Sequence, residues 1–162
     1  MTIDKEALKA VFVSQVQADL DAALLQQKTA QNDATHEEAR AENDKDTRGL
    51  ESSYLARGLA RRAMEFKATL AALKGVSTRV FSDDEKVGLA ALVTIEDDSG
   101  EERIYFMVSS GGGLKAEIAE LVVKIVTPDS PLGKALMGRE LDDEILIHTP
   151  KGKREAVISN IA

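Results

Sequence analysis

Mostly apolar residues in the first half of the chain recur at intervals of three and four positions. The first series comprises Val13, Val16, Leu20, Ala23, Gln27, Ala30 and Ala34. The second series comprises Leu55, Leu59, Ala63, Phe66, Leu70 and Leu73. This spacing places each series on one face of a helix and is typical of the contact line of a coiled coil. The pattern therefore predicts two long helices packed antiparallel as a hairpin.

The composition of this half supports the prediction of a hairpin. Residues 4–74 contain no proline and only two glycines, Gly49 and Gly58, and they are rich in residues that favour helices. The first series changes to alanine toward the connection, so the two helices can approach closely there. At about 1.5 Å per residue, an arm of ~30 residues extends roughly 45 Å. This exceeds what a small domain needs for its own core, so we expect the arm to serve for reach.

The second half changes to the pattern of strands after Lys74-Gly75, a pair that is typical of a helix end. We predict strands at residues 77–81, 88–95, 103–108, 121–126, 144–149 and 154–158. Turn residues at 97–100 and 150–152 join two of these pairs as hairpins, and Pro131 begins a short helix over residues 131–137. The predicted fold class is α+β, with a coiled-coil hairpin at residues 1–75 and a small antiparallel β-sheet domain at residues 76–162.

Composition and charge limit the chemistry that this chain can perform. The chain has no cysteine and only two histidines, His36 and His148, so any metal must be held by oxygen atoms. The formal net charge of −7 argues against direct wrapping of nucleic acid and favours a basic protein partner. The first residues lack a signal peptide and no apolar run reaches ~20 residues, so we expect a cytoplasmic protein without membrane contact.

Acidic residues gather in the predicted connection between the two helices. They are Glu37, Glu38, Glu42, Asp44 and Asp46. Carboxylates concentrated at one exposed point can hold a hard divalent cation such as Mg²⁺. A charge run of this kind also forms an ordinary solvated turn. From these residues alone, both interpretations stay open.

The Gre family of bacterial transcript cleavage factors has a C-terminal signature that resembles residues 127–158, T-P-D-S-P-L-G-K-A-L-M-G-R-E-L-D-D-E-I-L-I-H-T-P-K-G-K-R-E-A-V-I. The signature combines a serine-proline pair, a small helix with A-L-x-G, an acidic turn and a T-P-x-G-x-R-E hairpin. Residues 93–108 are also similar to the first hairpin of that family's C-terminal domain. The resemblance implies a C-terminal domain of the FK506-binding-protein type, without isomerase activity.

The resemblance also implies a function. Gre factors bind bacterial RNA polymerase, insert their coiled coil into its secondary channel and promote cleavage at the transcript 3′ end in a backtracked complex. The factor is not itself an enzyme and needs no cofactor when free, but its tip helps to hold Mg²⁺ in the polymerase active site. Here the candidate tip acids are Glu38, Glu42, Asp44 and Asp46, and the loop that matches the family's rim-contacting loop is Asp129, Ser130 and Pro131. We expect a monomer.

The tip departs from the family's pattern at one position. Glu42-Asn43 matches a glutamate-asparagine pair, but the aspartate expected three residues before it is replaced by Ala39, with Glu38 one step further back. If the helix continues, Glu38 and Glu42 share one face, and Asp44 and Asp46 are alternative ligands. Three hypotheses follow: a factor that stimulates cleavage, a regulator that occupies the channel without cleavage, and a coiled-coil interaction module unrelated to transcription.

Overall fold

The computed structural model describes the backbone of residues 2–40 and 47–162, and their side chains except those of residues 34, 37–40, 47–49 and 52. The chain forms two compact units. Ser14–Leu70 make up the hairpin unit, and the segment up to Val13 together with Ala71–Ala162 makes up the β unit.

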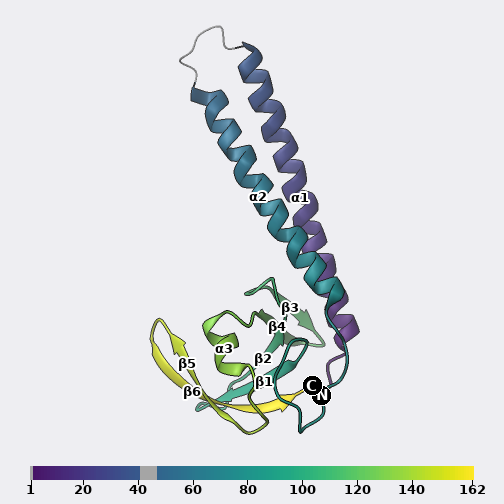
Figure 1. Cartoon of the computed structure of the whole chain (residues 1–162), viewed down its shortest axis with the longest axis vertical. Coiled ribbons are helices and arrows are strands. Elements are labelled where there is room, and N and C mark those ends of the chain that lie inside the picture. Colours follow the sequence, from purple (N-terminus) through teal and green to yellow (C-terminus); the bar gives the residue numbers. More distant parts are fainter. Residues whose placement is uncertain (1, 41–46) are drawn as a thin grey trace. The chain divides into compact units, whose positions relative to one another are not determined.

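Two long helices, α1 (Lys5–Arg40) and α2 (Thr47–Gly75), run side by side in the hairpin unit and continue into the β unit (Figure 1). Asp4 caps the start of α1, because its carboxylate accepts hydrogen bonds from the N–H groups of Glu6 (2.9 Å) and Ala7 (3.2 Å). At about 1.5 Å per residue, the 36 residues of α1 extend roughly 54 Å. The predicted helical hairpin is therefore confirmed.

The predicted contact line of the hairpin is buried at most of its positions. In the hairpin unit the buried apolar side chains include Val16, Leu20, Ala23, Ala30, Ala56, Ala63 and Leu70. One position was predicted wrongly: the side chain of Leu55 is 59% exposed, and its neighbour Ala56 is only 7% exposed. Alanine on both helices permits close approach at this level, and the larger leucine stays outside.

A six-stranded sheet and a short helix form the β unit (Figure 1). The strands are β1 (Leu92–Asp97), β2 (Glu102–Met107), β3 (Lys115–Ile118), β4 (Leu121–Val126), β5 (Glu144–Thr149) and β6 (Gly152–Ile161), and the helix is α3 (Pro131–Leu136). Their order across the sheet is β3-β4-β2-β1-β6-β5. The β1–β2 and β5–β6 hairpins turn where the sequence predicts. The α+β class is confirmed.

The sheet is mixed, which corrects the prediction of a wholly antiparallel one. Strands β2 and β4 pair in parallel. The reason is β3, an edge strand that the sequence did not reveal, which turns back directly into β4. That turn holds Ala119 and Glu120 at φ values of 49° and 65°, the left-handed geometry of a two-residue hairpin turn. Because neither residue is glycine or asparagine, the usual sequence signal for such a turn is missing.

Two predicted strand segments are irregular instead. Residues 77–81 form no strand, and β1 begins at Leu92 rather than at Gly88. The backbone at Ala90 has a φ of 72°, which prevents β1 from starting earlier. Phe81, Val87 and Ala91 are nevertheless buried in the core. The apolar pattern of this segment therefore reflects burial, not extended pairing.

The core of the β unit positions α3 on one face of the sheet. Leu136 of α3 belongs to the same buried cluster as Val93 and Ile95 of β1 and Met107 of β2. Leu132 of α3 packs against the edge of this cluster. The start of α3, and the loop that leads into it, are therefore fixed relative to the strands.

A buried lysine joins the start of α1 to the irregular segment before β1. Lys5 is only 6% exposed. Its Nζ donates hydrogen bonds to the carbonyl oxygens of Arg79 (2.7 Å) and Ala90 (2.8 Å) and lies 4.8 Å from the ring centroid of Phe81. Burial lowers the pKa of Lys5 to about 8, with the charge of Arg79 acting in the same direction and that of Glu85 opposing it. Lys5 thus fastens the first turn of α1 within the β unit.

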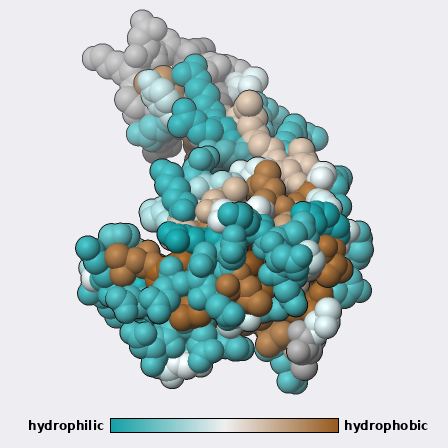
Figure 2. Space-filling view, turned by 60° about the horizontal axis from the view of Figure 1, so that its bottom comes forward, coloured by the Kyte–Doolittle hydropathy of each residue, from teal (hydrophilic) through white to brown (hydrophobic). Residues whose placement is uncertain are grey.

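The outer surface carries apolar side chains in separate patches. Figure 2 shows them interrupted by polar side chains on the face of the β unit turned toward the viewer. The exposed large apolar residues include Val80, Leu89 and Val122, which lie on different segments. Scattered exposure of this kind is ordinary for a folded domain. In residues 2–40 and 47–162, no helix has the length and apolar character needed to cross a bilayer.

Candidate functional site

The predicted tip acids lie mostly outside the described residues. Helix α1 ends at Arg40 and α2 begins at Thr47. Glu42, Asp44 and Asp46 fall in the undescribed segment between them, and Glu38 belongs to α1 although its side chain is not described. In the part of the chain that the structure describes, no group of three or more acidic or histidine side chains could hold a metal ion. The predicted Mg²⁺ ligands offer only carboxylate oxygens, which suit that ion.

The predicted rim loop forms the N-terminal corner of α3, and we call residues 127–131 the α3 corner. Ser130 is the N-cap of the helix: its Oγ accepts a hydrogen bond from the N–H of Gly133 at 3.0 Å. The same hydroxyl donates to the carbonyl oxygen of Thr127 at 2.8 Å, and the Ser130 N–H donates to that oxygen at 3.1 Å. Pro131 occupies the first helical position, where a missing N–H leaves no bond unmade. The corner is thus tied by its own hydrogen bonds.

Gly133 lets the first turn of α3 sit directly against this corner. A Cβ atom at Gly133 would lie 1.8 Å from the Thr127 carbonyl oxygen and 2.7 Å from its carbonyl carbon. No side chain fits in that space. The close approach leaves Asp129 and Pro131 exposed at the outside of the corner, while Ser130 is partly buried.

The α3 corner therefore presents Asp129 and Pro131 side by side on a backbone that hydrogen bonds hold in place. Among the residues that the structure describes, the Asp129 carboxylate has no hydrogen-bond or ion-pair partner, and the ring of Pro131 is rigid by its chemistry. An exposed carboxylate without a partner, carried by a backbone that hydrogen bonds hold in place and lying beside an apolar ring, suits contact with another protein. Sequence reasoning found Asp129, Ser130 and Pro131 but missed Thr127 and Gly133. Glycine is unfavourable inside a helix, so Gly133 within the six residues of α3 could have indicated a close backbone contact.

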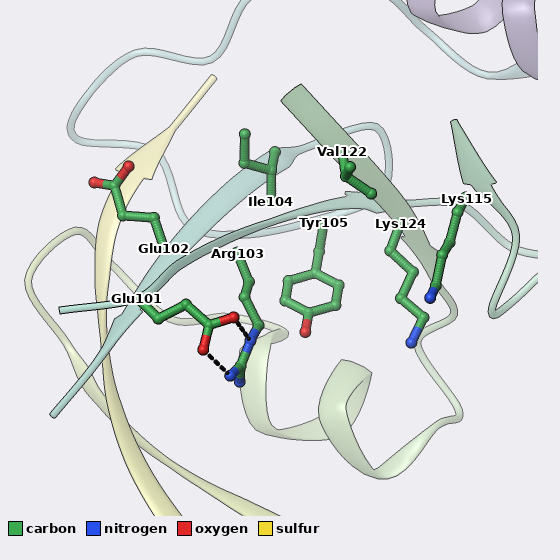
Figure 3. A pocket seen from close by; sticks show the side chains of 8 residues that line it. All are labelled: Glu101, Glu102, Arg103, Ile104, Tyr105, Lys115, Val122 and Lys124. Carbon is green, nitrogen blue, oxygen red and sulfur yellow. Dashed lines mark hydrogen bonds and ion pairs between the residues drawn. The ribbon is translucent and has the colours of Figure 1, made fainter. Parts of the chain in front are cut away.

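A second feature, not found from the sequence, is a cavity of about 490 Å³ over β2, β3 and β4 (Figure 3). Its lining includes Arg103, Tyr105, Lys115 and Lys124. In the strand order, β4 lies between β3 and β2, and this brings the lining residues of the three strands together around the cavity.

Arg103 is already neutralised within this cavity. Its Nη2 donates to carboxylate oxygens of Glu101 (2.8 Å) and Asp97 (3.2 Å), and its Nε donates to Glu101 (3.3 Å). The hydrogen bond to Glu101 raises the pKa of Arg103. Asp97 also accepts hydrogen bonds from Ser99, which are the main reason that the pKa of Asp97 is lowered. Arg154 supplies a second cation, since its Nη1 lies 4.0 Å from the Asp97 carboxylate, so two guanidinium groups face two carboxylates and the group is internally balanced.

The comparisons with known proteins identify the family. Residues 82–162 match the family model described as transcription elongation factor, GreA/GreB, C-terminal. The transcription elongation factor GreA of Nitratidesulfovibrio vulgaris is 30% identical over 128 residues, which cover 77% of this chain and 76% of that protein. The chain belongs to the GreA/GreB family.

Two further proteins are similar to this chain. A transcription inhibitor protein Gfh1 of Thermus thermophilus is 39% identical over 71 residues, or 44% of each chain. The crystal structure of GreA factor homolog 1 (Gfh1) of Thermus thermophilus aligns over 93% of this chain and 94% of that one, with 25% identity and a TM-score of 0.40. The chain spans about half the length of several curated relatives that it matches, between 40% and 56%.

Proposed function

We propose that this protein is a transcription elongation factor that binds bacterial RNA polymerase and stimulates cleavage of backtracked transcripts. The observation that carries the proposal is the family match over residues 82–162, which includes the α3 corner. In this proposal the α3 corner docks on the rim of the polymerase secondary channel, with Asp129 and Pro131 making the contact. The helical hairpin provides the reach into the channel.

The tip of the hairpin supplies carboxylates to the polymerase active site. Glu38, Glu42, Asp44 and Asp46 are the residues that would hold Mg²⁺ there. Glu38 lies in the last turn of α1, and the other three lie in the sequence between α1 and α2. A second bound Mg²⁺ stabilises the attacking and leaving oxygens in hydrolysis of a phosphodiester. The nuclease activity belongs to the polymerase, so this chain contributes ligands and acts as no enzyme of its own.

A second candidate is a regulator that occupies the channel without stimulating cleavage. Two observations favour it: the tip carries Ala39 where the family's pattern has an aspartate, and one similar protein is named a transcription inhibitor. Such a regulator would still dock through the α3 corner. It would slow nucleotide addition instead of shortening the transcript.

The test is a transcript cleavage assay with stalled, backtracked polymerase complexes in Mg²⁺. We expect the wild-type protein to shorten the transcript, and we expect the Glu42→Gln/Asp44→Asn variant to lose most of this activity because the tip loses two negative ligands. The matched control is Asp19→Asn/Glu65→Gln, which makes the same change of charge at exposed positions on α1 and α2. Binding with slower nucleotide addition and no shortening would favour the regulator. Failure to bind polymerase would contradict both.

Docking is tested separately with Asp129→Asn. We expect this variant to bind polymerase about tenfold more weakly, which corresponds to the loss of roughly one charge-assisted hydrogen bond. Its stability should not change, because the Asp129 carboxylate has no described partner in the free protein. The control is Asp98→Asn, which changes an exposed aspartate in the β1–β2 turn. Equal affinity of Asp129→Asn and wild type would show that the corner is not the contact.

A further inference from the structure

Two lysines face each other in the cavity over β2, β3 and β4. Lys115 on β3 and Lys124 on β4 are direct cross-strand partners, and Lys124 is also the partner of Tyr105 on β2. Figure 3 shows the side chains of all three reaching out from the same side of the sheet. Like charges directly opposite each other in a sheet are destabilising. The pair therefore works against the stability of the unbound protein.

Neither lysine is neutralised by the rest of the chain as far as the structure describes it. In residues 2–40 and 47–162, no carboxylate forms an ion pair with Lys115 or Lys124, and their ammonium groups donate no hydrogen bond. Arg103, in contrast, is shared between Glu101 and Asp97. The free donors on this surface are thus the two ammonium groups and the hydroxyl of Tyr105.

These donors match a phosphate group better than a carboxylate. A phosphate monoester carries a charge of roughly −1.5 to −2 at neutral pH and has three strong acceptor oxygens. Two lysines supply compensating point charges, whereas planar carboxylates are best recognised by the fork of a free guanidinium. The one guanidinium in the lining is already occupied. A tyrosine hydroxyl has an ordinary pKa of about 10, so that of Tyr105 is protonated at neutral pH and can donate to an anion. Burial raises the pKa of Tyr105 further.

We infer that Lys115, Lys124 and Tyr105 form a binding site for the phosphate group of a small phosphorylated ligand. The cavity of about 490 Å³ lies within the size range of small-molecule sites. The half-buried ring of Tyr105 stands beside the lysines, where it can contact the organic part of the ligand. This site is separate from the α3 corner and the hairpin tip, and it does not depend on polymerase binding.

The experiment is an NMR titration of the nitrogen-15-labelled full chain with inorganic pyrophosphate and, separately, with ADP. We expect saturable shifts of amides in β2, β3 and β4, with a dissociation constant on the order of 1 mM for a few charge-assisted hydrogen bonds at an open site. The Lys115→Gln/Lys124→Gln variant should bind at least tenfold more weakly. The control is Lys151→Gln/Lys153→Gln, which removes the same charge from exposed positions at the β5–β6 hairpin and should bind as wild type does.

Comparison of the two ligands separates the contact with the phosphate from the contact with the organic group. Tighter binding of ADP than of pyrophosphate supports a contact between the Tyr105 ring and the organic group, and equal binding supports recognition of phosphate alone. A short polyglutamate peptide that binds the same residues at least as tightly as pyrophosphate would overturn the assignment to phosphate. Absence of saturable shifts, or unchanged affinity in the Lys115→Gln/Lys124→Gln variant, would overturn the site itself. The spectrum of that variant checks its fold, which should persist because a repulsion is removed.

Discussion

Replacing Gly133 with alanine is expected to lower the free energy of unfolding of the β unit by at least about 3 kcal/mol. The added Cβ would lie 1.8 Å from the Thr127 carbonyl oxygen, which belongs to the backbone and cannot rotate away. Relief requires the α3 corner to separate from the first turn of α3. That movement breaks the two hydrogen bonds that link Ser130 to Thr127 and the bond from Gly133 to Ser130.

The measurement is unfolding in urea, monitored by hydrogen exchange of the amides in β4, β5 and β6. These amides report on the β unit separately from the hairpin unit. A matched control is Gly58→Ala in α2, where a new Cβ meets no atom within 4 Å. That substitution should be neutral or stabilising by up to about 1 kcal/mol, because alanine favours a helix interior. An unchanged β unit in Gly133→Ala would mean that the corner is not tightly packed. In that case the fixed geometry assumed for docking would also be wrong.

Replacing Lys5 with methionine is expected to lower the free energy of unfolding by about 2 kcal/mol at pH 7. Methionine keeps much of the aliphatic length but leaves the carbonyl oxygens of Arg79 and Ala90 without their donor. It also removes the cation held 4.8 Å from the Phe81 ring centroid. The removal of a buried charge offsets part of this loss. Urea unfolding of the β unit measures the net effect, and equal stability would show that the contacts of Lys5 do not outweigh its burial.

The difference in stability between the wild type and Lys5→Met is expected to depend on pH, and the lowered pKa of Lys5 gives the direction. Below pH 8 the Lys5 amine is protonated in both the folded and the unfolded chain. Between about 8 and its ordinary pKa of 10.5, the unfolded chain still binds the proton and the folded chain does not. Stability rises with pH wherever the unfolded state binds more protons. The stability of the wild type relative to Lys5→Met should therefore increase from pH 8 to 10. A matched control is Lys9→Met, which removes a single hydrogen bond, to the Val76 carbonyl oxygen, and should destabilise less.

The sequence predicted those parts of the fold whose residues follow a regular period or a recognisable turn. The two long helices were evident because their buried positions recur over many turns, and the β1–β2 and β5–β6 hairpins because glycine or proline marks their turns. The segment before β1 was misjudged because Phe81 and Val87 are buried from an irregular backbone. Periodicity reports which residues are buried, and it cannot say whether the backbone that carries them is extended.

The functional features divide in the same way. Ser130 and Pro131 are strong signals of a helix start and predicted α3, but the α3 corner was singled out as a contact site only through the resemblance to the Gre family. Lys5 was not found, since a lysine in the first turn of a helix looks like a solvated residue until its partners on distant segments are known. The cavity with Lys115 and Lys124 also depends on long-range arrangement. It exists only because a two-residue turn returns β3 into β4, and that turn contains no glycine or asparagine by which it could have been predicted.

The contacts of Lys5 also constrain the order in which the chain can fold during its synthesis. The two carbonyl groups that receive its hydrogen bonds lie 74 and 85 residues further along the chain. The first turn of α1 therefore leaves the ribosome well before its anchoring partners have been translated. The two helices can pack against each other in the meantime. Lys5 can make both of its hydrogen bonds only after residue 90 has emerged.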